Sequence, residues 1–388
     1  MEKEINAHLN EYFGELEDPR RDHTRRHLLL DIIVIAICAV ISGADDFEAV
    51  AEFGIAKEEW LRRFLALPNG IPSHDTFWRV FRALDPVQFE RCFRTWMAAA
   101  IELHPGEVIA IDGKTLRRSY ENCPKQGPIQ LVSAWATENN VVLGQLRIDE
   151  KDNEIVAVPQ LLEQLDVAGC LVTTDAMSCQ VKTAQRILER QGDYLLALKE
   201  NQPGLYGDVS LLFDDLAASD YRAYPFSQDK SVDNGHGRIE TRRIWVIDDP
   251  QVLKMLPNAE RWPQLRSLIK IESQRILTAG PLEKRGERSV YCRYYISSAT
   301  ASATFFNAAV RKHWQIENAA HWVLDVAFRE DLSRLRRDNC AQNFATLRRI
   351  ALSLLKQDRS SKLGLKNKRL KATWDHNYFL HLLSIMMN

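Results

Sequence analysis

The sequence lacks paired cysteines, a signal-peptide pattern and a long apolar run, which are features of secreted, zinc-binding and membrane proteins. Its seven cysteines form no CxxC pair and are odd in number, which argues for reduced thiols in a cytosol and against a zinc ribbon. The first residues, MEKEINAHLNEYF, are acidic and lack the apolar stretch of a signal peptide. The longest apolar run, residues 32–41, is too short to cross a bilayer. We therefore expect a cytoplasmic protein without membrane contact, with residues 32–41 in a buried helix.

An excess of charge of one sign is also absent. The chain has 51 basic and 52 acidic residues and a net charge of −1, which by itself counts against a nucleic-acid binder. The basic residues nevertheless gather in three clusters: Arg20, Arg21, Arg25 and Arg26; Arg334, Arg336 and Arg337; and Lys356, Arg359, Lys362, Lys366, Lys368, Arg369 and Lys371. Such clusters can neutralise phosphates even when the total charge is near zero. Solvated surface is the alternative interpretation of each cluster.

The length of 388 residues leaves room for two or three domains. Apolar residues recur at helical spacing through residues 1–103, which predicts a helical N-terminal domain for DNA binding or assembly. Within it, residues 72–81 begin with proline and a Ser or Asp cap and continue as a helix. This helix suits either DNA reading or packing against the rest of the protein.

The pattern changes near residue 104. Residues 104–201 predict five strands and two helices in the order β-β-β-α-β-α-β, with the second and third strands joined as a hairpin. The expected strands cover residues 108–111, 130–137, 141–148, 170–174 and 194–199, and the helices residues 154–165 and 179–191. This order is typical of an α/β, RNase H-like mixed sheet.

Two carboxylates follow strands of this sheet. Asp112 comes directly after the first strand and Asp175 after the fourth. In the RNase H-like order these strands are parallel neighbours, so the two side chains should lie side by side where ligands bind open α/β sheets. The alternative for each Asp alone is a turn or helix cap.

Residues 202–298 interrupt the alternation with six prolines and three strand-like stretches, at 238–247, 265–274 and 289–296. They predict an inserted β-rich subdomain. Residues 299–388 then hold a long helix, about 304–329, and an increasingly basic helical C-terminus.

The long helix offers a third carboxylate. Glu317, His321, Asp325 and Phe328 are spaced four, four and three apart and should share a face. Glu317 stands among Trp314, Ile316 and Trp322, and burying a charge there is costly without a partner. Glu317 is therefore the first choice for a third metal ligand and Asp325 the second.

Oxygen ligands of this kind suit hard cations. Phosphodiester cleavage by two metal ions needs few carboxylates, with water and phosphate oxygens completing the coordination. The segment from His313 to His321 could alternatively be a helical metal cluster, although it does not match HExxH. Histidines in such a segment are more often hydrogen-bond partners in a packed helix.

Several motifs together resemble the ISAs-type insertion-sequence transposases, which include the H-repeat-associated proteins. The resemblance covers nearly the whole chain. The motifs are 18–20 (DPR), 72–76 (PSHDT), 111–115 (IDGKT), 174–176 (TDA), 235–242 (GHGRIETR), 313–318 (HWQIEN), 321–326 (HWVLDV) and 328–331 (FRED).

The resemblance implies a DDE transposase in a bacterial cytoplasm. Carried over residue by residue, it gives Asp112, Asp175 and Glu317 as catalytic residues and metal ligands. It further implies magnesium, with manganese as a substitute, and double-stranded DNA as partner, both terminal inverted repeats and target. A homodimer in a synaptic complex is also expected.

The sequence departs from the broader group of transposases with a β insertion. Val310 and His313 stand where that group has Tyr and Arg, and no Lys follows on the expected face. Arg311 or Lys312 could substitute in contacting phosphate. The remaining candidates are Lys114, Lys366, Lys368 and Arg369 for DNA contact, and His313, Trp314, His321 and Asp325 in supporting roles.

Three other functions stay open. One is an RNase H-like nuclease without strand transfer. The second is a transposase-derived DNA-binding protein of an immobile element. The third is a zinc hydrolase that uses His313, Glu317 and His321.

Overall fold

The computed structural model describes residues 2–119, 127–149, 151–235, 237–279 and 286–387. The chain divides into two compact units. Unit 1 comprises residues 1–103, 113–153 and 316–388, and unit 2 comprises residues 104–112 and 154–315. These units divide the chain differently from the four segments expected from the sequence, because unit 1 gathers both ends of the chain.

The strands form one mixed sheet in the order β3-β2-β1-β4-β5-β9-β8-β7-β6. Its first five strands are β1 (Val108–Thr115), β2 (Gln130–Ala136), β3 (Val141–Ile148), β4 (Leu171–Thr174) and β5 (Asp193–Leu198). Strands β2 and β3 pair antiparallel, whereas β1 with β4 and β4 with β5 pair parallel. This is the RNase H-like arrangement, which confirms the predicted fold class, hairpin and parallel neighbours.

In unit 2, helices alternate with the parallel strands. They are α7 (Glu154–Glu163) and α8 (Val181–Glu189), which contact each other. All four residues of β4 are buried. Burial on both faces is what parallel strands require, and it explains the continuous apolar run that predicted this strand.

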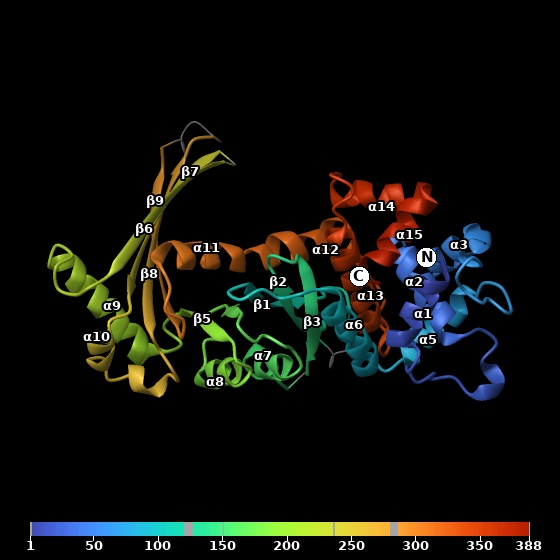
Figure 1. The fold of residues 1–388 in the computed structure, drawn as a ribbon, viewed down its shortest axis with the longest axis horizontal. Coiled ribbons are helices and arrows are strands. Elements are labelled where there is room, and N and C mark those ends of the chain that lie inside the picture. The colour runs from blue at the N-terminus through green and yellow to red at the C-terminus, as the bar shows by residue number, and fades with distance from the viewer. Residues whose placement is uncertain (1, 120–126, 150, 236, 280–285, 388) are drawn as a thin grey trace. The chain divides into compact units, whose positions relative to one another are not determined.

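The segment expected to be a β-rich insertion holds four long antiparallel strands, seen side by side in Figure 1. Its elements are α9 (Pro203–Ala218), β6 (Ser227–Gly235), β7 (Arg238–Ile247), α10 (Pro250–Lys254), β8 (Ser267–Leu277) and β9 (Arg288–Ser297). All three strand-like stretches are confirmed, and β6, α9 and α10 were missed. The strands extend the sheet in reverse order, since β5 pairs with β9.

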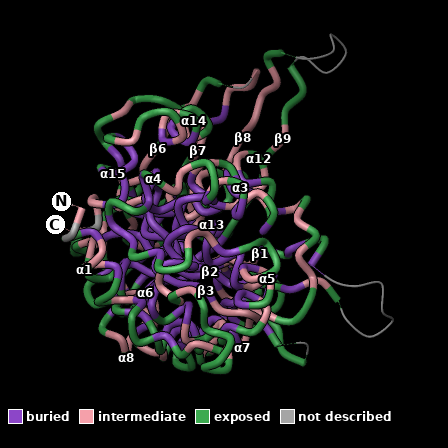
Figure 2. Tube along the Cα trace, turned by 90° about the vertical axis from the view of Figure 1, so that its right-hand side faces the viewer, coloured by how far each residue is buried: buried purple, intermediate pink, exposed green. Residues whose placement is uncertain are grey.

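Unit 1 is largely helical. Its α-helices are α1 (Glu2–Phe13), α2 (Leu29–Ser42), α3 (Phe47–Ala56), α4 (Glu58–Leu61), α5 (His74–Ala83), α6 (Pro86–Ala100), α12 (Trp322–Val326), α13 (Cys340–Gln357), α14 (Leu365–Trp374) and α15 (His376–Ser384). Residues 32–41 of α2 are completely buried, which confirms the helix predicted there. Helix α13 packs against α2, α5, α6 and β3, and Figure 2 shows buried residues, in purple, around it.

Helix α5 covers the segment that suited either DNA reading or packing. Phe77, Val80 and Phe81 are buried, and the helix contacts α3 and α13. Its opposite side, with His74 and Arg79, is exposed. Among the described helices, none has the length and apolar character needed to cross a membrane.

Candidate active site

Asp112 and Asp175 follow the last paired residues of two neighbouring parallel strands of unit 2. The register pairs Ile111 with Thr174, so Asp112, within β1, and Asp175, directly after β4, each come one residue later. Neighbouring strands lie about 4.8 Å apart. Both side chains are half-buried. The structure therefore brings this predicted pair together, although β1 continues to Thr115 rather than ending before Asp112.

A cavity of about 100 Å³ opens beside Asp175. Its lining includes Thr173, Lys199, Arg293, His313 and Trp314, all from unit 2. The Lys199 and Arg293 side chains are exposed at this surface. Two cations beside a carboxylate suit a ligand that is itself anionic and metal-bound, such as a phosphodiester. Sequence reasoning missed Lys199 and Arg293 because they belong to β-strand segments with no motif around them.

Glu154, the first residue of α7, is a further carboxylate of unit 2, and its charge interacts with that of Asp175. Burial raises its pKa, and the charge of Asp175 raises it further. The influence of Asp175 places the two acids near each other in unit 2. No pattern in the sequence marked Glu154, since a Glu in the first turn is common in any helix.

Helix α11 (Ala303–His313) carries His313 to the same cavity. Phe306, Ala309 and Val310 on one face of α11 pack in the core formed with β1, β4 and β5. His313 Nδ1 then lies 2.9 Å from the Thr173 hydroxyl. Burial lowers the pKa of His313 to about 4, although the Asp175 charge acts in the opposite direction. The ring is thus neutral at pH 7.

Trp314 follows His313 at the cavity wall. The two rings meet edge to face with centroids 5.9 Å apart, and the Arg293 guanidinium lies 5.2 Å from the Trp314 ring centroid. These contacts keep His313, Trp314 and Arg293 in one cluster. The two supporting residues expected from the sequence, His313 and Trp314, are therefore beside Asp175.

The long helix expected over residues 304–329 is interrupted. After α11, residues Ile316–His321 form a π-helical turn that belongs to unit 1 and leads into α12. A π turn bonds residue i to i+5, so it widens the helix and rotates the residues after it; such turns occur frequently at functional sites.

The interruption corrects two expectations about Glu317. Its side chain is exposed, whereas Phe328 is 1% exposed, so Glu317 and Phe328 do not share a face. The expected apolar surroundings are also wrong, since Trp314 and Trp322 are 36% and 59% exposed. The π turn changes the register that a 3.6-residue period assumes. The role of Glu317 as third ligand stays a prediction.

His321 and Asp325, also given supporting roles, lie in unit 1. Burial, together with the nearby Arg349 and Lys114 charges, lowers the pKa of His321 to about 3. Asp325 accepts hydrogen bonds from Lys114 Nζ through both carboxylate oxygens, each at 2.7 Å. Lys114 is only 9% exposed, so the expectation that it contacts DNA is wrong for this conformation.

The C-terminal basic cluster is split between surface and interior. Lys366 is exposed as expected of a phosphate contact. Lys368 donates to the Leu355 and Asp358 carbonyls, and Arg369 donates to the carbonyl of Val40 at 2.8 Å. Both are at least nine-tenths buried, so the structure corrects their assignment as DNA contacts. The helical period of α14 turns them inward while Lys366 faces out.

The two basic residues of α11 also make contacts. Arg311 forms an ion pair of 2.6 Å with Asp233 on β6, at a half-exposed position. Lys312 is half-buried. Neither is placed on the cavity beside Asp175, whose lining is formed by their neighbours His313 and Trp314.

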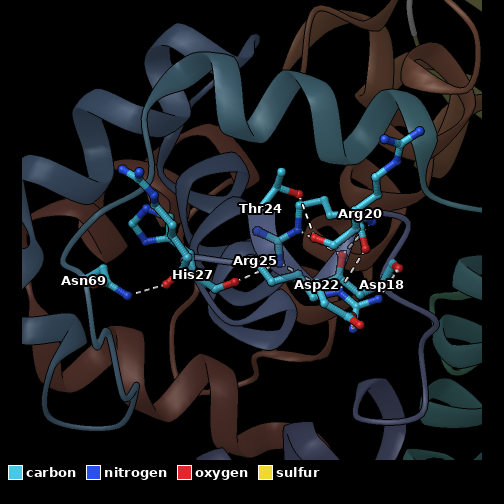
Figure 3. A network of polar contacts seen from close by, with 9 residues as sticks. Asp18, Arg20, Asp22, Thr24, Arg25, His27 and Asn69 are labelled. Atoms are coloured by element: carbon cyan, nitrogen blue, oxygen red, sulfur yellow. Dashed lines mark hydrogen bonds and ion pairs between the residues drawn. The ribbon is translucent and has the colours of Figure 1, made fainter.

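The N-terminal basic cluster is shaped by one carboxylate (Figure 3). Arg20 donates to both oxygens of Asp18, at 2.9 and 2.6 Å, and to the His27 carbonyl. Arg25 donates to the carbonyls of Arg20 and Asp18. These bonds fold residues 18–27 into a compact loop, and Arg21 and Arg26 are exposed on it.

The described residues can be compared with the ligand sets that zinc and magnesium need. Across the part of the chain that the structure describes, no three His, Cys, Asp or Glu side chains gather closely enough to hold a metal ion. Zinc sites need at least three protein ligands. Magnesium keeps several waters and is often bound by one or two carboxylates plus substrate phosphates. The Asp112 and Asp175 pair therefore fits magnesium and gives no preformed zinc site.

Comparisons with known proteins agree on a family. A family model described as "DDE_Tnp_1-associated" matches residues 10–97, and one described as "Transposase DDE domain" matches residues 103–354. The chain is 38% identical over 382 residues to the "H repeat-associated putative transposase YhhI" of Escherichia coli K12, covering 97% of each. It is 39% identical over 377 residues to the "Putative transposase YncI" of Escherichia coli O157:H7, covering 97% of this chain and 94% of the relative.

Among solved structures, the piggyBac transposase synaptic complex with hairpin DNA aligns with 99% of this chain and 77% of that chain. The identity is 12% and the TM-score 0.42. The sequence matches span both the N-terminal helices and the segment with the paired carboxylates. The chain belongs to the transposase DDE domain family.

Proposed function

We propose that this protein cleaves the phosphodiester bonds at the ends of an insertion element and joins the released 3′-hydroxyl to target DNA. The observation that carries the proposal is that Asp112 and Asp175 each directly follow the paired residues Ile111 and Thr174 of two neighbouring parallel strands. The exposed cations Lys199 and Arg293 at the adjoining cavity support it, because they would attract the DNA backbone.

Asp112 and Asp175 would hold magnesium, with manganese as a substitute, and Glu317 is proposed as the third ligand. The bound ions would supply an activated attacking oxygen and a stabilised leaving oxygen. The exposed position of Glu317 on the π turn leaves its carboxylate accessible to such a role.

The chain's own residues would prepare the substrate. Lys199 and Arg293 would orient the phosphate beside Asp175 by charge. His313, neutral and bonded to Thr173, would keep the α11 end seated on β4. Two copies of the chain would pair two element ends in one complex in the bacterial cytoplasm.

The alternatives fare differently. No three donors gather among the described residues, neither the His313 set of a zinc hydrolase nor Asp112, Asp175 and Glu317. Magnesium is favoured because one or two carboxylates with water and phosphate oxygens can hold it, whereas a zinc site needs at least three protein ligands. A protein that only bound DNA would have no need for the carboxylate of Asp175 beside the cations Lys199 and Arg293. A nuclease without strand transfer would use the same site, and only the reaction products distinguish it from a transposase.

The deciding experiment incubates purified protein with labelled element-end DNA, unlabelled target DNA and magnesium. Cleavage that leaves a 3′-hydroxyl, together with labelled joint molecules, supports the proposal. Cleavage without joint molecules would instead identify a nuclease. Binding without cleavage, in magnesium and manganese alike, would leave only a DNA-binding protein.

A further inference from the structure

Lys114 stands out because it is a lysine placed inside the protein. Its side chain is 8% exposed, and lysine is rarely buried unless it is paired. The pairing is complete: Nζ donates to both oxygens of Asp325 at 2.7 Å and lies 3.7 Å from Asp331. An ammonium group held in this way cannot bind a phosphate without breaking these contacts.

The ion pair of Lys114 and Asp325 joins two segments that carry proposed catalytic residues. Lys114 follows Asp112 by two residues on β1, and side chains two apart point to the same face of a strand. Asp325 lies on α12, directly after the π turn that bears Glu317. The ion pair thus anchors the end of β1 to the helical segment of Glu317.

Further ion pairs hold the segment that contains Asp325 and Asp331 in place. Asp331, beside Lys114, also pairs with Arg117 at 3.3 Å. Its neighbour Glu330 is completely buried and accepts a hydrogen bond from Arg349 of α13 at 2.8 Å. The segment that follows α12 is therefore fixed to the core of unit 1, and Lys114 is the basic residue that connects β1 to it.

We propose that Lys114 is a positioning residue of the cleavage reaction, which holds the Glu317-bearing segment to the end of β1, the strand of Asp112, through Asp325. The proposal rests on the proposed function for its activity arm. Misplacing a reacting group by about 1 Å can cost roughly a hundredfold in rate. Lys114 needs no contact with DNA to act in this way.

The experiment uses the full-length protein with Lys114→Met, Lys114→Arg and Asp325→Asn. Arg117→Met serves as the matched control, because it removes the exposed cation that shares Asp331. Single-turnover cleavage, the salt dependence of DNA binding, melting temperature and amide hydrogen exchange over residues 316–326 are measured for each.

We expect Lys114→Met and Asp325→Asn to slow cleavage about a hundredfold with an unchanged salt slope. Exchange over residues 316–326 should become faster in both variants. Lys114→Arg should recover part of the rate, since it keeps the charge, and Arg117→Met should resemble the wild type in rate and exchange.

Two results would overturn the proposal. A salt slope lowered by about 0.9 in Lys114→Met would make Lys114 a phosphate contact. A lowered melting temperature with normal cleavage and normal exchange at low temperature would make it a stabilising residue only. If the wild type itself failed to cleave, the proposed function would fall, while the exchange measurements would still decide whether Lys114 anchors this segment.

Discussion

The His313 ring and the Thr173 hydroxyl are joined by a hydrogen bond of 2.9 Å that ties α11 to β4 two residues before Asp175. Because the ring supports the strand that leads to Asp175, we expect His313→Ala to reduce cleavage about tenfold without abolishing it. His321→Ala should have a similarly mild effect. Single-turnover cleavage of element-end DNA measures both, and complete loss in His313→Ala with an active Asp112→Asn would replace the magnesium site by a histidine-ligated one.

Substitution of the three proposed metal ligands should have a much larger effect on cleavage than substitution of the histidines. Asp112→Asn, Asp175→Asn and Glu317→Gln are each expected to abolish cleavage, because an amide keeps the shape of the group but loses its charge and its affinity for magnesium. Folding and DNA binding should persist, and relief of repulsion should leave the Asp variants slightly more stable without metal. Cleavage and melting temperature are measured together on the same preparations.

Glu317→Gln also tests the third ligand separately. Activity retained in Glu317→Gln but lost in Asp112→Asn would remove Glu317 from the site. Asp325, the second choice from the sequence, would then be the next residue to substitute, followed by Glu154, whose pKa the Asp175 charge helps to raise.

The exposed part of the C-terminal basic cluster should bind phosphates. Replacing Arg359, Lys362 and Lys366 together by glutamine is expected to lower the salt slope of DNA binding by roughly 0.9 for each phosphate interaction that is removed. Replacing the buried Lys368 instead should lower the melting temperature and leave the slope unchanged. A slope unaltered by the triple substitution would reduce these three residues to solvated surface.

The buried ion pair of Glu330 and Arg349 should be sensitive to loss of one partner. Both side chains are at most 1% exposed, and the bond between them is 2.8 Å. Arg349→Met leaves the Glu330 charge without this partner in the interior, which should cost about 3–5 kcal/mol of unfolding free energy. Urea denaturation measures it; a loss below about 1 kcal/mol would show that Arg348 replaces Arg349 as partner.

Glu90 on α6 should make stability depend on pH. It accepts a hydrogen bond from the backbone N–H of Gln145, and burial raises its pKa from 4.5 to about 7. The folded state therefore prefers the protonated acid, and its contribution is present below pH 4.5 and lost as pH rises to about 7. Relative to Glu90→Gln, the wild type should lose about 3 kcal/mol across this window. Parallel stability curves for the two proteins would contradict the raised pKa.

Much of the site could be predicted because it lies on buried strands. Continuous apolar runs ending in a carboxylate identified Asp112 and Asp175, and strand order made them neighbours. Strand β6, with the sequence SQDKSVDNG, has no apolar alternation and left no signal. It is an edge strand, and edge strands are commonly polar because this discourages pairing with other chains.

The surroundings of Glu317 could not be predicted for a different reason. Helical periodicity assumes 3.6 residues per turn, and the π turn breaks that assumption at the residue of interest. The burial of individual lysine and arginine side chains also could not be predicted from a cluster of basic residues in the sequence. Lys114, Lys368 and Arg369 resembled surface charges until their carboxylate and carbonyl partners were known.

The assembly of unit 1 from both ends of the chain has a consequence during protein synthesis. Helix α2 is completely apolar over residues 32–41, and much of its cover is α13, which the ribosome completes about 300 residues later. A frameshift or stop codon before Cys340 would leave that apolar helix uncovered, a state that proteases and chaperones remove. We therefore expect a gene copy truncated before α13 to yield an N-terminal fragment that is degraded faster than the intact protein.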